Sequence, residues 1–433
     1  MNMLEKLKEL SLAEPIAVVG MGASGRSALR FLQEAGYEVV GVDERVQTNV
    51  TTISLTDKKR LEQYATLVVS PGVDRRKAAI RHSQAKVIND IELFARLAEK
   101  PIAAVTGSNG KSTVVTMLAE VLQAQGLSVR LCGNIGRPVL EALFDAPEET
   151  DVYVLELSSY QLEICPSFHA DVGAVLNVSP DHLDRYDSYQ DYVAAKAHLA
   201  AASDVCILNG DDVACVEMAA LAKQAIFYSM NGANRVEGEH IFISDSPVLS
   251  TAALSVHGMH NFFNALTTLL MAQALGVIPE KAAKALMLFR GLPHRMRLVS
   301  EENGVKWLDD SKATNIGATA AALSGITAPT WLIVGGVGKN QDFSELAKII
   351  LQSCVKRVLM IGVDNRDMQA AFDAEGVVYT VCGEMNHAVS LARKEALSGD
   401  WVLLSPATAS FDQFNGYAER GECFAYEVTS SCR

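Results

Sequence analysis

The chain has 433 residues, more than one hydrophobic core usually supports, so its length predicts about three domains. Hydrophobic residues make up 49% of the chain and charged residues 21%, a balance that excludes an intrinsically disordered protein. The formal net charge of −13, with no evident basic cluster, argues against nucleic acid as a partner.

Cysteine usage and hydropathy bear on the compartment. The eight cysteines form no C-x-x-C pair, which favours reduced thiols in a cytoplasm over a disulfide framework or a zinc site. Charged residues interrupt the start of the chain, so no signal peptide is expected there, and no later run of about 18 apolar residues predicts a membrane span. We expect a cytoplasmic protein without a membrane segment and, by default, a monomer.

Short apolar runs rich in β-branched residues alternate with helical stretches along the chain. This alternation predicts an α/β fold with parallel sheets covered by helices on both faces. The expected strands are residues 16–20, 38–42, 67–70, 102–106, 151–155, 172–178, 331–335, 357–362 and 401–405.

Two positions in the sequence are expected domain boundaries. A helical pattern over residues 91–99 stops before Pro101, and a new strand-loop-helix unit begins there. A second boundary lies near residues 291–294, after a helical pattern over residues 280–289. We therefore expect three α/β domains at residues 1–95, 96–293 and 294–433.

The first glycine-rich motif, residues 20–25, reads Gly-Met-Gly-Ala-Ser-Gly between an expected strand and a helix, and it fits G-x-G-x-x-G. The glycines allow a tight turn, and the N–H groups at a helix start attract a phosphate. Asp43, at the end of the next strand, is placed to accept a hydrogen bond from a ribose hydroxyl. The motif predicts a nucleotide or dinucleotide without saying which; a tight turn with no ligand is the alternative.

The second motif, residues 106–113, reads Thr-Gly-Ser-Asn-Gly-Lys-Ser-Thr and precedes a helical pattern over residues 114–125. Val105 occupies the position of the first glycine in the phosphate-loop pattern, but the G-K-[ST] part is kept. Backbone N–H groups would surround the phosphates, Lys111 would reach the β- and γ-oxygens, and Ser112 would bind Mg²⁺. The motif predicts a nucleoside triphosphate site, with an ordinary glycine-rich turn as the alternative.

Two further polar groups leave expected strands at the same edge of the central sheet. Glu156 follows the strand at 151–155 and is a candidate Mg²⁺ ligand, unless it is only a solvated acid. His182 follows the strand at 172–178; a lone histidine is more often structural, and Asp181 beside it can serve as a helix cap. Lys196 lies in a helix of small and apolar residues, and these residues alone indicate a surface lysine with an extended stem.

The last third of the chain presents cations at glycine-rich or charged strand ends. Arg295 follows the second boundary, Lys312 follows the paired acids Asp309 and Asp310, and Lys339 follows a Gly-Gly-Val-Gly run. Such strand ends are typical of anion sites, although each of them alone could be an ordinary turn.

The order of these motifs resembles the Mur ligases, the ATP-dependent amino-acid ligases of peptidoglycan precursor synthesis, over essentially the whole chain. The resemblance rests on residues 106–113, 133–136, 156–159, 181–182, 196, 260–264, 294–295 and 309–315. Residues 20–25, 70–72 and 405–414 are similar to the branch that adds D-glutamate to UDP-N-acetylmuramoyl-L-alanine, and the D-N-P-R signature of diaminopimelate-adding relatives is absent. The implied fold is a central P-loop ATP-binding α/β domain flanked by Rossmann-like N-terminal and C-terminal domains.

The resemblance also implies a site, in which an acyl phosphate forms on the L-alanyl carboxylate and the amine of D-glutamate displaces phosphate. The implied catalytic residues are Lys111, Glu156, His182 and Lys196. Two Mg²⁺ ions are implied, on Ser112, Glu156, His182 and a carbamylated Lys196, which reverses the surface interpretation of that lysine. ATP is assigned to Gly107, Ser108, Asn109, Gly110, Lys111, Ser112, Thr113, Asn134, Asn261, Asn264, Arg295, Asp310 and Lys312. The UDP substrate is assigned to Gly22, Ala23, Ser24, Asp43, Glu44, Ser70, Asn134, Ser158 and His182, and D-glutamate to Lys312, Thr314, Lys339, Ser410, Phe411 and Tyr417.

Three other functions stay open at this point. A folylpolyglutamate-type ligase shares the ATP core, but a nucleotide-type first domain argues against it. A nicotinamide oxidoreductase would explain residues 20–25 and leave Lys111 and Glu156 without a purpose. A nucleotide-sensing module without catalysis is the third alternative.

Overall fold

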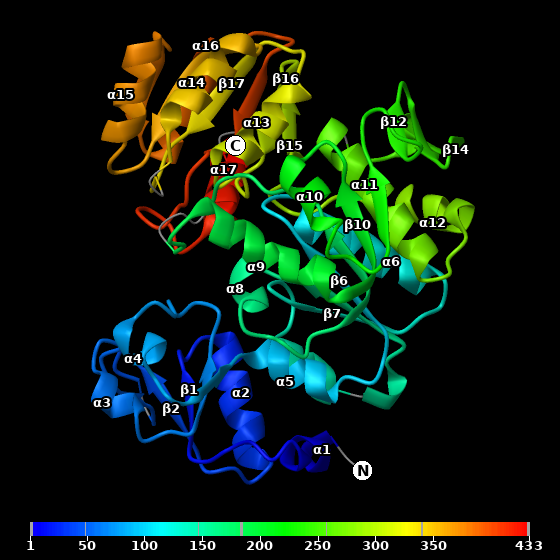
Figure 1. The fold of residues 1–433 in the computed structure, drawn as a ribbon. Helices are drawn as coiled ribbons and strands as arrows, with labels where there is room; N and C mark the ends of the chain where they lie inside the picture. The colour runs from blue at the N-terminus through cyan, green and yellow to red at the C-terminus, as the bar shows by residue number, and fades with distance from the viewer. Residues whose placement is uncertain are drawn as a thin grey trace. The chain divides into compact units, whose positions relative to one another are not determined.

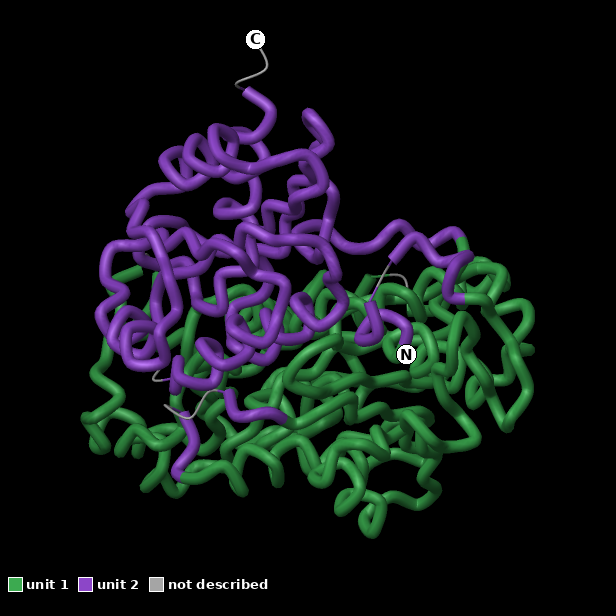
Figure 2. Tube along the Cα trace, turned by 90° about the horizontal axis from the view of Figure 1, so that it is seen from above, with its two compact units in different colours: residues 1–178, 188–250, 263–287 green, residues 179–187, 251–262, 288–433 purple. Residues whose placement is uncertain are grey.

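The computed structural model of the chain describes residues 3–47, 49–145, 147–181, 185–256, 258–338 and 341–430. The chain forms two compact units, which Figure 2 colours separately and Figure 1 draws as a ribbon. Unit 1 comprises Met1–Val178, Ser188–Ser250 and Phe263–Met287. Unit 2 comprises Ser179–Asp187, Thr251–Phe262 and Leu288–Arg433.

The first sheet of unit 1 is parallel and has the order β3-β2-β1-β4-β5. Its central strand β1 alternates between two apolar clusters, with Ile16 and Val18 on one face and Ala17 and Val19 on the other, because successive side chains of a strand point to opposite faces. The strands are β1 (Ile16–Val19), β2 (Val39–Asp43), β3 (Thr51–Thr52), β4 (Thr66–Val69) and β5 (Lys86–Ile88), and the helices are α1 (Met3–Glu9), α2 (Ala23–Glu34), α3 (Lys58–Leu61), α4 (Ala78–Arg81) and α5 (Asp90–Leu97).

The second sheet of unit 1 is also parallel, with the order β11-β10-β9-β6-β8-β7. Its strands are β6 (Ile102–Thr106), β7 (Val129–Gly133), β8 (Val152–Glu156), β9 (Ala170–Val175), β10 (Ser203–Asn209) and β11 (Ala225–Tyr228). One apolar cluster contains residues from β1 and α5 as well as from β6 and β8, so the two sheets of unit 1 share a core.

Helices and one small antiparallel sheet complete the chain up to Met287, with residues 251–262 assigned to unit 2. The helices are α6 (Lys111–Ala124), α7 (Val139–Phe144), α8 (Ser159–Leu162), α9 (Tyr189–Ala201), α10 (Val213–Met218), α11 (Met259–Ala274) and α12 (Pro279–Leu286), with 3₁₀ turns at Pro147–Glu149 and Thr251–Ala253. The small sheet is formed by β12 (Arg235–Glu237), β13 (His240–Ile243) and β14 (Ser246–Ser250).

Unit 2 contains one sheet of order β15-β16-β20-β17-β18-β19, in which β15 is antiparallel and the other strands are parallel. Strand β17 places Leu332 and Val334 in one cluster and Trp331 and Ile333 in the other, so both faces are buried. The strands are β15 (Arg297–Glu302), β16 (Val305–Asp309), β17 (Thr330–Val334), β18 (Val355–Ile361), β19 (Tyr379–Gly383) and β20 (Trp401–Leu404), and the helices are α13 (Ile316–Ser324), α14 (Phe343–Gln352), α15 (Arg366–Glu375), α16 (Met385–Glu395) and α17 (Tyr417–Ser430).

The parallel α/β architecture expected from the sequence is confirmed, and each expected strand is present with its ends shifted by a few residues. The domain boundaries at residues 95 and 293 stay a prediction. The seven cysteines among the described residues are all free, and four of them are buried. No helix in the described part of the chain has the length and hydropathy needed to cross a membrane.

Candidate functional site

The loop over residues 107–110 joins β6 to α6 at the carboxyl edge of the second sheet, and its shape is fixed by bonds to its neighbours. Lys111 Nζ donates to the carbonyl oxygens of Gly107, at 2.8 Å, and Ser108, at 2.9 Å. Asn177, just after β9, holds the loop through two acceptors. Its side-chain Oδ1 accepts a hydrogen bond from the N–H of Asn109 at 2.9 Å, and the backbone carbonyl oxygen of Asn177 accepts one from the N–H of Ser108. These bonds hold the loop in one conformation at the start of α6. Sequence analysis missed Asn177, although it follows a strand at the same edge.

Gly110 shows why this loop needs glycine. It is the N-cap of α6 with φ of 89°, a backbone conformation that other residues avoid. A Cβ atom there would lie 2.6 Å from Oδ1 of Asn264, one of the residues assigned to ATP. The structure thus brings Gly110 and Asn264 together on unit 1.

Glu156, the last residue of β8, presents a buried carboxylate with one free oxygen. Its side chain is 2% exposed, and its Oε1 accepts a hydrogen bond from Asn134 Nδ2 at 2.7 Å. Its Oε2 is buried and has no hydrogen-bond partner among the described residues. A buried, half-satisfied carboxylate is costly unless a cation completes it. Together with the buried hydroxyl residue Ser112 at the start of α6, this oxygen atom fits a Mg²⁺ site.

Lys196 is only 2% exposed, so the surface interpretation drawn from its helix alone is wrong. Its Nζ donates to the Gly107 carbonyl oxygen at 2.9 Å and lies 4.7 Å from the centroid of the Tyr192 ring. The Tyr192 hydroxyl is in turn 2.8 Å from Ser108 Oγ. Helix α9 therefore places Lys196 against the phosphate loop, and the Nζ atoms of Lys196 and Lys111 both donate to the Gly107 carbonyl oxygen.

His182 lies outside the described residues, so the second metal position implied by the resemblance stays a prediction. Asp181 beside it belongs to unit 2 and accepts a hydrogen bond from Asn315 at 3.3 Å. Within the described ranges, no three His, Cys, Asp or Glu side chains are gathered as a metal cluster.

The first glycine loop links β1 to α2, and its backbone is tightly constrained. A Cβ atom on Gly25 would lie 1.8 Å from the Gly20 carbonyl oxygen, so only glycine lets the helix approach the strand this closely. Ser70 Oγ donates to the same carbonyl oxygen at 2.6 Å. Gly22 and Ala23 are exposed at the helix start, and Ser24 is half-buried.

Asp43 supports this loop from the end of β2, and Glu44 follows it in the chain. Asp43 Oδ2 accepts from the N–H of Met21 at 2.8 Å. Burial pushes the pKa of Asp43 up, but N–H groups that include those of Arg45 and Met21 outweigh it and hold the pKa below its usual value. Glu44 pairs with Lys77, which lowers the pKa of Glu44. Ser158, also assigned to the UDP substrate, caps α8 through a reciprocal pair of bonds with Gln161.

In unit 2, Asp310 is buried at the carboxyl end of β16. Its Oδ2 accepts from Ser405 Oγ at 2.8 Å, and its Oδ1 accepts from Met296 N–H at 3.3 Å. Burial raises the pKa of Asp310 to about 7, against the opposing effects of Ser405 and Arg295. The neighbouring Asp309 lies 2.6 Å from His294 Nδ1.

A cavity of about 600 Å³ in unit 2 includes two residues assigned to ATP, Asn261 and Arg295. Arg290, Arg297 and Lys306 add to the basic character of its lining. His260 also lines it, and burial, with a smaller effect of Arg295, lowers the pKa of His260 to about 4. His260 is therefore uncharged at neutral pH among these fixed cations.

Of the described residues assigned to D-glutamate, Lys312, Thr314, Ser410 and Phe411 lie on loops at the carboxyl edge of the unit 2 sheet, and Tyr417 begins helix α17. Ser410 is 2% exposed, whereas Phe411 is 72% exposed. Lys312 Nζ lies 3.7 Å from the centroid of the Tyr417 ring, and Thr314 is half-buried. Lys339 lies outside the described residues, so its role stays a prediction.

Arg420, which no sequence motif indicated, connects the loop that bears Lys312 to the loop that bears Ser410. It is 1% exposed and donates to the carbonyl oxygens of Ser311, at 2.9 Å, and Thr408, at 3.0 Å. Its Nε also donates to Ser311 Oγ at 3.0 Å, and burial lowers the pKa of its guanidinium to about 10. One buried cation thus ties the loop that bears Lys312 to the loop that bears Ser410.

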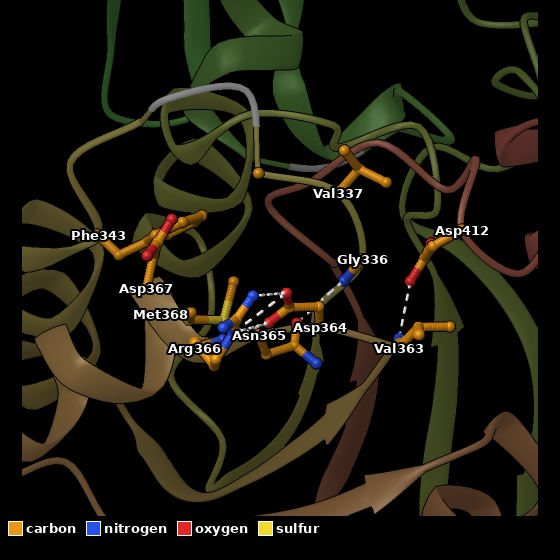
Figure 3. A pocket seen from close by; sticks show the side chains of 11 residues that line it. Gly336, Val337, Phe343, Val363, Asp364, Asn365, Arg366, Asp367, Met368 and Asp412 are labelled. Carbon is orange, nitrogen blue, oxygen red and sulfur yellow. Dashed lines mark hydrogen bonds and ion pairs between the residues drawn. The ribbon is translucent and has the colours of Figure 1, made fainter.

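A second cavity of unit 2, of about 350 Å³, adjoins the same loops (Figure 3). Gly336 and Val337 line it from the loop after β17, and Asp412 lines it from the loop that follows Ser410. The carboxylate of Asp412 accepts from Val363 N–H at 2.9 Å. The exposed guanidinium of Arg366, which also lines this cavity, bonds to the Asp364 carboxylate.

The chain is similar to known proteins over nearly its whole length. Three domain models match in chain order: the Mur ligase MurD-like N-terminal domain at residues 14–92, the Mur ligase middle domain at residues 105–272 and the Mur ligase glutamate ligase domain at residues 294–408. A protein of Alcanivorax borkumensis named UDP-N-acetylmuramoylalanine--D-glutamate ligase is 41% identical over 96% of this chain and 98% of its own length. The chain belongs to the Mur ligase family. A Chromobacterium violaceum protein of the same name is 40% identical over 96% of this Mur ligase and 97% of its own length.

Solved structures support the fold of this Mur ligase at lower identity. A MurF ligase from Thermotoga maritima, solved in complex with ADP, matches with a TM-score of 0.65 and 17% identity over the full length of both chains. A pseudomurein peptide ligase type C from Methanothermus fervidus matches with a TM-score of 0.63 and 18% identity over 96% of this chain and 99% of its own. At this identity the likeness concerns the fold alone, and it agrees with the three-domain α/β architecture.

Proposed function

We propose that this Mur ligase uses ATP to join D-glutamate to UDP-N-acetylmuramoyl-L-alanine, in the cytoplasm, as a monomer and as a step of peptidoglycan precursor synthesis. The observation that carries the proposal is the buried Glu156 carboxylate with its free Oε2, at the same sheet edge as Lys111 and its loop. A redox enzyme would have no use for this pair, whereas phosphoryl transfer needs both a cation and a metal ligand beside the triphosphate. The names of full-length relatives supply the substrates.

The first chemical step makes a poor electrophile reactive. An oxygen of the L-alanyl carboxylate attacks the γ-phosphorus of ATP, the bond to the β-bridging oxygen breaks, and ADP leaves with that electron pair. Lys111 and the backbone N–H groups of the loop other than those of Ser108 and Asn109, which bond to Asn177, would stabilise the negative charge that gathers there. Asn261 and Arg295, in the basic cavity of unit 2, and Asp310 would orient the nucleoside.

Two Mg²⁺ ions fit this proposal, the first on Ser112 and Glu156 and the second on His182 and a carboxylated Lys196. When bound, the ions would supply positive charge between the carboxylate and the triphosphate. Carboxylation joins the neutral Lys196 amine to the carbon of CO₂ and releases one proton. It would replace an ammonium that now shares the Gly107 carbonyl oxygen with Lys111 by an anion, which removes the repulsion between two neighbouring cations.

In the second step the amine of D-glutamate attacks the acyl carbon, loses a proton, and phosphate leaves from the tetrahedral intermediate. Lys312, Lys339 and Ser410 would hold the carboxylates of D-glutamate, and Arg420 would keep the loops of Lys312 and Ser410 in register. The product is an amide at the former L-alanyl carboxylate.

Phosphate release in the presence of ATP, UDP-N-acetylmuramoyl-L-alanine and D-glutamate tests the proposal, with each component omitted in turn. We expect release only when all three are present, with L-glutamate inactive as a matched control. Brisk ATP hydrolysis with neither co-substrate, or turnover of a folate, would refute the assignment. A light-scattering measurement of molar mass tests the monomer against the 46.6 kDa of one chain.

A further inference from the structure

Asn177 continues the pairing of β9 with β6 beyond the ends of both strands. Thr106 and Val175 are the last residues that pair within the sheet. Beyond them, the N–H of Leu176 donates to the Thr106 carbonyl oxygen at 3.1 Å, and the N–H of Ser108 donates to the Asn177 carbonyl oxygen at 2.9 Å. The phosphate loop therefore leaves the sheet while it is still bonded to the segment that follows β9.

The side-chain amide of Asn177 bonds to both polar backbone groups of a single loop residue. Its Oδ1 accepts from the N–H of Asn109 at 2.9 Å, and its Nδ2 donates to the Asn109 carbonyl oxygen at 3.1 Å. Such an amide satisfies a residue much as a neighbouring strand would. Asn109 directly precedes Gly110, whose φ of 89° turns the chain into α6. Asn177 therefore fixes the loop just before its turn.

The close packing of this segment explains why the loop carries glycine at residues 107 and 110. A Cβ atom on Gly107 would lie 3.1 Å from the Cβ of Leu176 and 3.4 Å from the backbone nitrogen of Asn177. A Cβ atom on Gly110 would lie 3.0 Å from the Cδ1 of Leu176. Both distances to Leu176 are tight, so the loop rests directly on the segment after β9.

Four side chains in turn hold the backbone on either side of Asn177. Two of them donate to the Leu176 carbonyl oxygen at 3.1 Å, the third accepts from the Val178 N–H at 2.8 Å, and the fourth donates to the Val178 carbonyl oxygen at 2.7 Å. In that order they are Asn209, Tyr228, Asp212 and Tyr189. The backbone at Asn177 cannot shift without breaking these bonds, so it gives the loop a rigid support.

The bonds to Asn177 also decide which backbone donors can meet a phosphate. The N–H groups of Ser108 and Asn109 are used by Asn177. Helix α6 begins at Lys111, and the first N–H groups of a helix have no acceptor within the helix. These groups and the helix dipole favour an anion at the start of α6. The place of a phosphate there depends on how the preceding loop residues are held.

We propose that Asn177 is a positioning residue for the phosphates of ATP, which fixes residues 107–110 so that the start of α6 and Lys111 meet the transferring phosphoryl group in one geometry. The inference rests on the proposed function, which places ATP at this loop. Asn177 acts through the loop and not on the nucleotide, since both polar atoms of its amide face the Asn109 backbone. A small misplacement of the reacting phosphate slows its transfer strongly.

Asn177→Ala removes both side-chain bonds and keeps the backbone bond from Ser108, so it is the decisive variant. We expect the KM for ATP to rise and kcat to fall, with kcat/KM for ATP at least about tenfold lower in the phosphate-release assay. The KM values for UDP-N-acetylmuramoyl-L-alanine and D-glutamate should stay within about twofold of the wild type. In calorimetry with the full chain and Mg²⁺, the Kd of a non-hydrolysable ATP analogue should rise at least about tenfold.

Asn234→Ala is the matched control on the same unit. Asn234 also bonds to the backbone through both ends of its amide, because its Nδ2 donates to the Phe227 carbonyl oxygen at 2.8 Å and its Oδ1 accepts from the Ser244 N–H at 3.0 Å. Both variants lose two bonds of this kind, and thermal unfolding measures the structural cost of each. Only Asn177→Ala should change the kinetics with ATP.

Asn177→Asp is a second variant with nearly the same shape. It keeps the acceptor for the Asn109 N–H and places an oxygen atom, in place of Nδ2, against the Asn109 carbonyl oxygen. Two acceptors repel each other there, so kcat/KM for ATP should fall by at least about tenfold in this variant too.

Each outcome bears on one level of the argument. A folded Asn177→Ala protein whose kcat and KM for ATP lie within about twofold of the wild type overturns the inference, and so does an equal rise in the KM of all three substrates. If Asn177→Ala does not fold, Asn177→Asp is judged by the same kinetic criteria. If the wild type itself binds no ATP analogue, the proposed function fails and the inference fails with it.

Discussion

Replacing Glu156 with glutamine removes the negative charge of this side chain and keeps its shape, so it tests the proposed metal-binding role. Glu156 Oε1 accepts from Asn134 Nδ2, and a glutamine carbonyl oxygen can accept the same bond. Its Oε2 has no partner in the described part of the chain, so the amide nitrogen would occupy a position that forms no protein hydrogen bond now. The substitution removes a costly buried charge and leaves an unpaired amide nitrogen, which costs about 1–3 kcal/mol, so the two effects oppose each other and Glu156→Gln should remain folded.

The expected loss of activity is large, because the variant removes the charge that would bind Mg²⁺. A unit charge about 4 Å from a cation is worth about 4 kcal/mol at an effective dielectric constant near 20, which corresponds to about a 10³-fold reduction in kcat/KM. The Mg²⁺ concentration that gives half-maximal activity should rise as well.

The assay is steady-state phosphate release at several Mg²⁺ concentrations, with thermal unfolding measured in parallel. Glu120→Gln, at an exposed position of α6, is the matched control and should keep wild-type values in both measurements. A Glu156→Gln protein that is folded and retains more than about a tenth of wild-type kcat/KM would refute the metal-ligand argument.

Further substitutions probe the remaining parts of the site. Lys111→Ala should reduce turnover at least about 10²-fold in the phosphate-release assay, and near-normal activity would mean that the loop does not hold the triphosphate. Ser410→Ala and Lys339→Ala should raise the KM for D-glutamate far more than the KM for the UDP substrate, since carboxylate oxygens would lose donors; equal effects on both would contradict this. Arg420→Lys should lower stability by about 2 kcal/mol or more in denaturant unfolding and raise the KM for D-glutamate, because one ammonium cannot reach both loops. Lys196→Ala should abolish acyl-phosphate formation while calorimetry shows unchanged UDP-substrate binding, and mass spectrometry of the native protein should find an added carboxyl group on Lys196.

The sequence predicted most of the buried parallel strands, although it missed the interior strand β10, and it predicted the edges of the sheets poorly. A central parallel strand is apolar on both faces, as β17 is with Trp331 and Leu332, so its residues form a continuous run. Strand β15 has no such run: it is half-exposed and ends in Glu301 and Glu302. The antiparallel strands β12, β13 and β14 are likewise short and partly polar, and their pairing depends on turns rather than on burial.

Residues that act through the backbone of distant loops had no signature in the sequence. Asn177 holds the phosphate loop across a sequence separation of 68 residues. Arg420 holds Ser311 across 109 residues, and its own neighbours in α17 are an ordinary mixture of polar and apolar side chains. Motifs predict side chains that face a ligand, whereas the groups that fix a loop from behind become visible only once strands have been brought into register.

Lys196 shows most clearly how the chemistry of the site depends on contacts that local sequence cannot reveal. Its helix offers only small neighbours and the Tyr192 ring, which is compatible with either a surface lysine or a buried one. The structure places its Nζ on the carbonyl oxygen that also accepts from Lys111. Two ammonium groups this close, on a loop meant for phosphates, repel one another when the loop is empty. Converting Lys196 to an anion would turn the like-charge interaction with Lys111 into an attraction. The shared carbonyl oxygen therefore agrees with the modification of Lys196 that we propose from the family resemblance, and mass spectrometry of the native protein tests it.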